Sequence, residues 1–126
     1  IPKRRDSSIT IVSSIYGIVG RKNRFLYSSS KHFLVGAMKT LAVELARYNI
    51  RVNCVSPGYI NTRMTRKNNT KDQIKKIVKK IPMNRLGRTN EVATLISFLM
   101  SKKASYLTGQ DIVIDGGVMA GGLWED

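Results

Sequence analysis

Residues 27–58 read YSSSKHFLVGAMKTLAVELARYNIRVNCVSPG and carry the strongest structural signal in the chain. From Tyr27 to Tyr48, apolar residues cover most of the circumference of a helix, which indicates a helix that is buried on two sides. Ile50 to Val55 then predicts a buried strand, because its apolar residues are mostly β-branched. Pro57 and Gly58 end this strand, since neither residue is expected to continue a central ladder.

The flanking segments extend this pattern in both directions. Ser8 to Ser13 is a β-branched run that predicts a strand before the long helix, and Asp111 to Asp115 predicts a third strand near the end. Between them, Thr70 begins a small helix by a capping box, and Thr89 is the expected N-cap of a helix through about Met100. Strands that alternate with helices predict parallel pairing with right-handed crossovers, hence one α/β layered domain over residues 1–126.

Positive charge is concentrated in one part of the chain. The net charge is +14, and residues 63–80, named here the basic segment, carry eight basic residues against one acidic residue. Nucleic acid, acidic membranes and anionic substrates are all possible partners for such a charge. No zinc-ligand spacing or aromatic-rich RNA-binding pattern accompanies it, so specific nucleic-acid binding is not expected. A helix face that is simply solvated explains the same lysines.

Other features restrict the class of protein. The single cysteine, Cys54, lies in an apolar strand, which predicts a buried thiol, excludes an internal disulfide and is compatible with a reducing cytoplasm. No apolar run approaches the ~18 residues that a membrane span requires. The chain begins with a polar lead-in, residues 1–6, rather than with methionine, and we expect it to be a part of a longer protein.

Tyr27 and Lys31 are four positions apart, so they share one face of the predicted helix. A phenol with an ordinary pKa near ~10 is a weak base at neutral pH. An ammonium within about 4–6 Å favours the phenolate, and the start of a helix favours an anion as well. The pair therefore suits proton transfer, although by itself it is equally typical of one turn of a solvated helix.

Four signals in order are more specific than this pair alone. Ser14 lies thirteen residues before Tyr27 at the end of the first strand, "RVNCVSPGYINT" ends a strand in Pro-Gly, and "LTGQDIVIDGG" follows late in the chain. Over nearly its whole length, the chain resembles the C-terminal half of a classical short-chain dehydrogenase/reductase. The resemblance is weakest over residues 63–81, which such enzymes vary to suit their substrates. It implies the C-terminal part of a Rossmann-type doubly wound parallel sheet with flanking helices.

The resemblance also implies catalytic roles. Tyr27 would be the general acid/base of a reaction that interconverts a carbonyl and an alcohol. Lys31 would favour the phenolate and hydrogen-bond the nicotinamide ribose, and Ser14 would orient and stabilise the reacting oxygen. His32 is expected to be structural. No metal is required, because the cofactor carries the hydride.

The cofactor residues follow from the same resemblance. Pro57 and Gly58 would shape a loop over the nicotinamide, and the backbone of Ile60 would contact its carboxamide. Thr62 would hydrogen-bond the carboxamide or a phosphate, or would instead cap the following turn. The glycine-rich turn that holds the pyrophosphate is absent from this chain, so NAD and NADP are not distinguished.

Alternatives remain open. The chain could be a truncated, inactive product or a basic binding module with an oxidoreductase-like fold, although a module has no use for Ser14, Tyr27 and Lys31. As an enzyme, it would act on a small-molecule or carrier-linked carbonyl or alcohol, such as an acyl group on an acidic carrier protein or a nucleotide-linked sugar. The resemblance further implies a homo-oligomer that associates through helix 27–48.

Overall fold

A three-stranded parallel sheet forms the centre of the molecule. The computed structural model describes residues 6–122, so residues 1–5 of the expected polar lead-in lie outside the described part. The strands are β1 (Ser7–Val12), β2 (Ile50–Pro57) and β3 (Asp111–Ile114), and the sheet order is β1-β2-β3. Both pairs are parallel, and the register places Ser7 opposite Ile50 and Cys54 opposite Asp111. The predicted α/β class and parallel pairing are confirmed.

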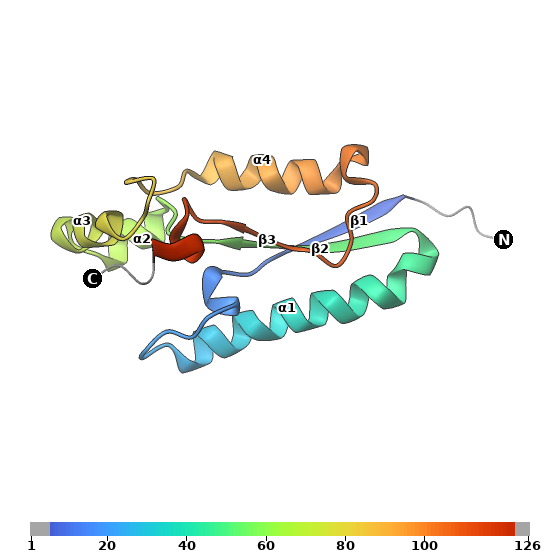
Figure 1. Cartoon of the computed structure of the whole chain (residues 1–126), viewed down its shortest axis with the longest axis horizontal. Coiled ribbons are helices and arrows are strands. Elements are labelled where there is room, and N and C mark those ends of the chain that lie inside the picture. Colours follow the sequence, from blue (N-terminus) through green and yellow to red (C-terminus); the bar gives the residue numbers. More distant parts are fainter. Residues whose placement is uncertain (1–5, 123–126) are drawn as a thin grey trace.

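One helix covers each face of the sheet. Figure 1 shows α1 (Phe25–Leu45) on one face and α4 (Thr89–Met100) on the other. The core on the α1 side contains Met38 and Ala42 from the helix and Val52 and Cys54 from β2. Cys54 is a free, fully buried cysteine, as expected, and burial raises the pKa of its thiol to about 11. Its thiolate is therefore scarce at neutral pH.

The outer face of α1 is open in this single chain. Phe33 and Val43, at 72 % and 81 % exposure, project from the side of the helix that does not meet the sheet. The helix begins two residues before the predicted Tyr27, and its last predicted turn is the 3-10 helix η2 (Ala46–Tyr48). No helix in the described part is both long and apolar enough to cross a membrane.

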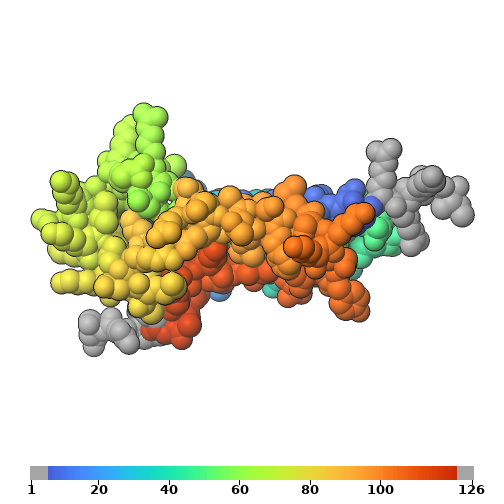
Figure 2. Space-filling model, turned by 90° about the horizontal axis from the view of Figure 1, so that it is seen from above, coloured from blue at the N-terminus to red at the C-terminus, as the bar shows by residue number. Residues whose placement is uncertain are grey.

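The basic segment forms a separate lobe beyond the carboxyl ends of the strands. It contains α2 (Arg63–Asn68) and α3 (Lys71–Lys79), which lie at one end of the molecule in Figures 1 and 2. The predicted capping box of α3 is present, since Gln73 N donates to Thr70 Oγ1 and Thr70 N donates to Gln73 Oε1. Helix α2 has no apolar stripe in its sequence, and the sequence analysis did not predict it.

Two predicted strand and helix ends are wrong in detail. Pro57 is the last ladder residue of the central strand β2, paired with Ile114, because the end of a ladder tolerates a residue without an N–H. The N-cap of α4 is Arg88 rather than Thr89. The Glu91 carboxylate accepts from Arg88 N at 2.8 Å, and its hydrogen bond with Arg85 is the main cause that lowers the pKa of Glu91 to about 2.

Arg51 ties the end of α4 to the sheet. Its guanidinium donates through Nη1 to Leu99 O at 2.7 Å and Ala104 O at 2.9 Å, and through Nη2 to Ser101 O at 3.1 Å. Its Nε lies 3.7 Å from Asp6 Oδ1. Arg51 is only 6 % exposed, so a buried cation satisfies three carbonyl groups at the point where the helix ends.

Three further short helices complete the described elements: η1 (Ile15–Gly17), η3 (Lys102–Ala104) and η4 (Val118–Gly122). Ile15 and Tyr16 of η1, Ile81 after α3 and Val118 of η4 form a second small core. This core holds the turn after β1 against the lobe of the basic segment. It lies at the carboxyl end of the sheet, where open α/β proteins bind their ligands.

Candidate active site

The candidate catalytic residues come from neighbouring elements at the carboxyl end of the sheet. Ser14 is the second residue after β1, and Tyr27 is in the first turn of α1. The loop 58–62 follows β2, the strand that pairs with β1. The parallel sheet therefore brings these segments to one end of the molecule (Figure 1).

Tyr27 and Lys31 lie on the same side of α1. The Lys31 ammonium is 5.7 Å from the centroid of the Tyr27 ring and donates to Val12 O at 3.3 Å. That bond places Lys31 over the end of β1, and two of its three ammonium protons remain for other acceptors. The Tyr27 side chain is 45 % exposed, so it is accessible to a ligand.

Ser14 is buried and is the N-cap of η1. Its Oγ accepts from Tyr16 N at 3.2 Å, so the hydroxyl proton stays available for donation. The neighbouring Ser13 donates through Oγ to Lys31 O at 3.0 Å. Gly17 lets this turn approach α1 closely, because a Cβ there would lie 2.8 Å from Lys31 O. The turn that contains Ser14 thus packs directly against α1 at Lys31.

The loop after β2 is fixed by two other segments. Gly58 N donates to Ile114 O at 3.0 Å, and a Cβ on Gly58 would lie 2.7 Å from Asp115 Cβ. Gly87 N donates to Tyr59 O at 2.9 Å, and Asn61 N donates to Gly87 O at 2.8 Å. Glycine at position 58 is therefore a steric requirement for the path of this loop.

Thr62 and Ile60 already have partners within the chain. Thr62 is the N-cap of α2, and its Oγ1 accepts from Thr65 N at 3.1 Å. This is the capping role that the sequence analysis left open. The carbonyl of Ile60 accepts from Thr62 N at 2.9 Å and from Thr65 Oγ1 at 2.8 Å.

A pair of tyrosines joins the two loops, and sequence reasoning missed it. The Tyr16 and Tyr59 hydroxyls are 2.6 Å apart and hydrogen-bonded. Burial first, and then this hydrogen bond, raise the pKa of Tyr16 above its ordinary value, so Tyr16 stays protonated. The two residues are 43 positions apart, and no motif spacing could have indicated their contact.

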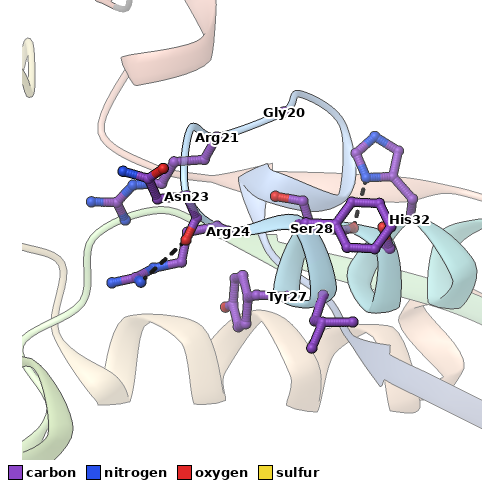
Figure 3. A pocket seen from close by; sticks show the side chains of 10 residues that line it. Gly20, Arg21, Asn23, Arg24, Tyr27, Ser28 and His32 are labelled. Atoms are coloured by element: carbon purple, nitrogen blue, oxygen red, sulfur yellow. Dashed lines mark hydrogen bonds between the residues drawn. The ribbon is translucent and has the colours of Figure 1, made fainter.

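An open cavity of about 1090 Å³ borders Tyr27. Figure 3 shows its lining, which comes from the loop 20–24 and from the first turns of α1 as far as His32. The His32 Nδ1 is 2.8 Å from Ser28 O, one turn earlier in the same helix. The described residues contain no cluster of three or more His, Cys, Asp or Glu side chains that could hold a metal ion.

Comparison with known proteins gives consistent results. Residues 2–119 match the family model described as Enoyl-(Acyl carrier protein) reductase. The chain is 46 % identical to the 3-oxoacyl-[acyl-carrier-protein] reductase of Buchnera aphidicola subsp. Schizaphis graminum, with 92 % of this chain and 47 % of that protein aligned. The chain thus spans about half the length of the curated relatives that it matches.

Solved structures agree. A 4-hydroxyisoleucine dehydrogenase mutant complexed with NADH and succinate superposes with a TM-score of 0.88 at 34 % identity, covering 94 % of this chain and 49 % of that one. ElxO with NADP bound superposes with a TM-score of 0.83 at 36 % identity, covering 90 % of this chain and 46 % of that one. The three-stranded sheet and its two helix layers therefore correspond to about half of each of these proteins.

Proposed function

The chain belongs to the short-chain dehydrogenase/reductase family, and from this premise we propose that the protein interconverts a carbonyl and a secondary alcohol by hydride transfer with NAD or NADP. The proposal is supported by the position of the Lys31 ammonium 5.7 Å from the centroid of the Tyr27 ring and by the contacts of Ser13 and Gly17, on either side of Ser14 and η1, with Lys31 O. A phenol, an ammonium and a hydroxyl are the groups that such a reaction needs for its proton.

The donor set of the site fits a nicotinamide cofactor. When bound, the cofactor supplies or accepts the hydride. Lys31 has two free ammonium protons after its bond to Val12 O, which suit the hydroxyls of a ribose. Tyr27 would exchange a proton with the substrate oxygen, and the free hydroxyl proton of Ser14 would stabilise negative charge on that oxygen. Pro57, Gly58, Ile60 and Thr62 would border the nicotinamide.

The first prediction concerns residues 1–126 alone. We expect no detectable turnover of NADH or NADPH and no micromolar binding, since most cofactor binding energy comes from pyrophosphate and adenosine contacts that this chain does not supply. Fluorescence titration with both cofactors measures binding, and a carbonyl-reduction assay measures turnover.

A chimera is the matched comparison. It would carry the N-terminal half of the Buchnera reductase followed by residues 1–126, and we expect it to bind a cofactor and to turn over. A folded chimera that binds the cofactor but has no activity with any carbonyl or alcohol substrate would contradict the proposed reaction. Micromolar cofactor binding by residues 1–126 alone would contradict the expectation that most contacts with the cofactor come from outside these residues.

We also propose that the substrate is linked to an acidic carrier, as the name of the Buchnera relative suggests for that protein. All eight basic residues of the basic segment are exposed. Helix α2 starts directly after the loop 58–62, so this charge lies next to the proposed cofactor site. Surface charge of this kind raises the rate of encounter with an oppositely charged partner more than it strengthens the bound complex.

The second prediction tests this steering. For the active protein with an acyl carrier substrate, kcat/KM is expected to fall several-fold between low salt and about 0.15 M salt, while kcat changes little. Replacing Lys75 and Lys79 by glutamine should flatten the profile. The control replaces Lys102 and Lys103 by glutamine. These residues follow the C-terminal end of α4, far from the basic segment, and their replacement should leave the salt dependence unchanged. An unchanged salt dependence of kcat/KM in the Lys75 and Lys79 variant would indicate that the lysines of the basic segment only form a solvated helix face.

Finally, we propose that the exposed apolar face of α1 associates with a second copy of the chain. Phe33 and Val43 are both more than 70 % exposed on this face, and large exposed apolar side chains are frequent at interfaces.

A further inference from the structure

The loop before α1 is rich in positive charge that no acidic side chain balances. Arg21, Lys22 and Arg24 fall within four positions, and the sequence has no acidic residue between Asp6 and Glu44. In the described part of the chain, the ion pairs are those of Arg51 and Arg85 only. Arg24 makes a long 3.5 Å contact with Asn23 O, and its remaining guanidinium protons are available to a ligand.

Both arginines line the cavity that Tyr27 borders. Figure 3 shows Arg21, Asn23 and Arg24 on the loop side and Tyr27 on the helix side of the same hollow. The Arg21 guanidinium lies 5.0 Å from the centroid of the Tyr16 ring, which anchors this arginine to the turn that carries Ser14. A ligand that reaches Tyr27 through this cavity would therefore pass within the field of two cations.

The start of α1 adds to this positive potential. Among the residues that the structure describes, the first turn contains no acidic residue and the N-cap, Arg24, makes no side-chain capping bond, so no side chain there offsets the positive end of the helix. A separate observation concerns Ser28, which also lines the cavity. Ser28 is 8 % exposed, and within the described residues its Oγ has no hydrogen-bond partner.

We infer that Arg21 and Arg24 form a binding subsite for an anionic group of the substrate, a carboxylate or a phosphate, with Ser28 as an additional hydroxyl donor. The inference rests on the proposed function for its substrate, because it places the anion on the molecule whose carbonyl or alcohol reacts at Tyr27. The two arginines then select substrates that carry a negative charge at a distance from the reacting carbon. Their guanidinium groups suit both anions, since each offers paired N–H donors to two oxygens.

Anion binding is measured on the protein itself, without a nicotinamide cofactor. Isotope-labelled protein is titrated with sodium phosphate and separately with sodium succinate, at an ionic strength held constant with sodium chloride. We expect saturable shifts of the backbone amide signals of residues 21–28 for at least one of the two anions. A stronger response to phosphate assigns the subsite to a phosphorylated carrier, and a stronger response to succinate assigns it to a free acid.

Substitutions identify the groups responsible. Arg21→Gln and Arg24→Gln should each weaken anion binding by about fivefold, the upper range for one exposed ion pair. Arg24→Lys should recover part of the loss. Lys39→Gln, an exposed position on α1 outside the cavity, is the matched control and should bind as the wild type does.

Equal affinity in wild type and in both glutamine variants would overturn the subsite, and so would shifts confined to the basic segment. The proposed reaction fails separately. Anion binding with no hydride transfer in the chimera would reject the proposed reaction and leave the anion subsite standing. Turnover by the chimera with anion binding that does not depend on Arg21 or Arg24 would reject the subsite and leave the reaction standing.

Discussion

Replacing Tyr27 by phenylalanine in the active chimera should lower kcat by about 100- to 10,000-fold, the usual contribution of a positioned acid/base. The change removes one hydroxyl and keeps the ring. Cofactor affinity should therefore stay within about twofold of the wild-type value, because the Lys31 contact with Val12 O does not involve the phenol. Stopped-flow or steady-state assays give kcat, and fluorescence titration gives the dissociation constant of the cofactor.

Tyr48→Phe is the matched control for this experiment. Tyr48 is half-exposed in η2, at the far end of the same helical stretch, and its loss of a hydroxyl should leave kcat unchanged. Retention of more than a tenth of the wild-type kcat by Tyr27→Phe would remove Tyr27 from its proposed role. A parallel loss of cofactor binding would point instead to a disturbed helix start.

Replacing Arg51 by leucine should lower the free energy of unfolding by about 2–4 kcal/mol. The substitution removes the guanidinium donor from the carbonyls of Leu99, Ser101 and Ala104, which keep only one weaker donor each, Ser8 Oγ, Ala104 N and Leu107 N. Leucine is shorter than arginine, so it offers apolar contact near the backbone but no hydrogen-bond donor. Urea denaturation followed by far-ultraviolet circular dichroism measures the change, and the slope of the transition shows whether the unfolding stays two-state.

Arg47→Leu controls for the loss of a positive charge. Arg47 is exposed, and its guanidinium lies 4.7 Å from the centroid of the Tyr48 ring, so its removal should cost about 0.5 kcal/mol or less. Equal destabilisation by the two substitutions would show that the end of α4 finds other donors, such as water, when Arg51 is absent.

The sequence predicted the elements that follow from local chemistry. β-branched runs located all three strands, and the Thr70–Gln73 spacing located the start of α3. Strands that alternate with helices gave the parallel pairing, since a helical crossover leaves few other arrangements. The positions of Ser14, Tyr27 and Lys31 at one end of the sheet follow from the same topology.

Features that depend on contacts between distant residues were out of reach. The Tyr16–Tyr59 hydrogen bond requires the path of two loops, and neither tyrosine belongs to a spaced motif. Helix α2 was missed because its one large apolar residue, Met64, is 71 % exposed and gives no periodic signal. Arg21 and Arg24 belong to no motif in the sequence, and only the structure shows that both line the cavity beside Tyr27.

The central position of β2 has a consequence for how this protein is synthesised. β2 pairs on one side with β1, about 40 residues earlier in the chain, and on the other with β3, more than 50 residues later. During synthesis, β1, α1 and β2 therefore emerge from the ribosome first and can assemble as a unit. The other edge of β2 stays unpaired until β3 emerges. During that interval the edge is open to pairing with other chains, and the charged lobe that is made next, α2 and α3, keeps the nascent chain strongly cationic.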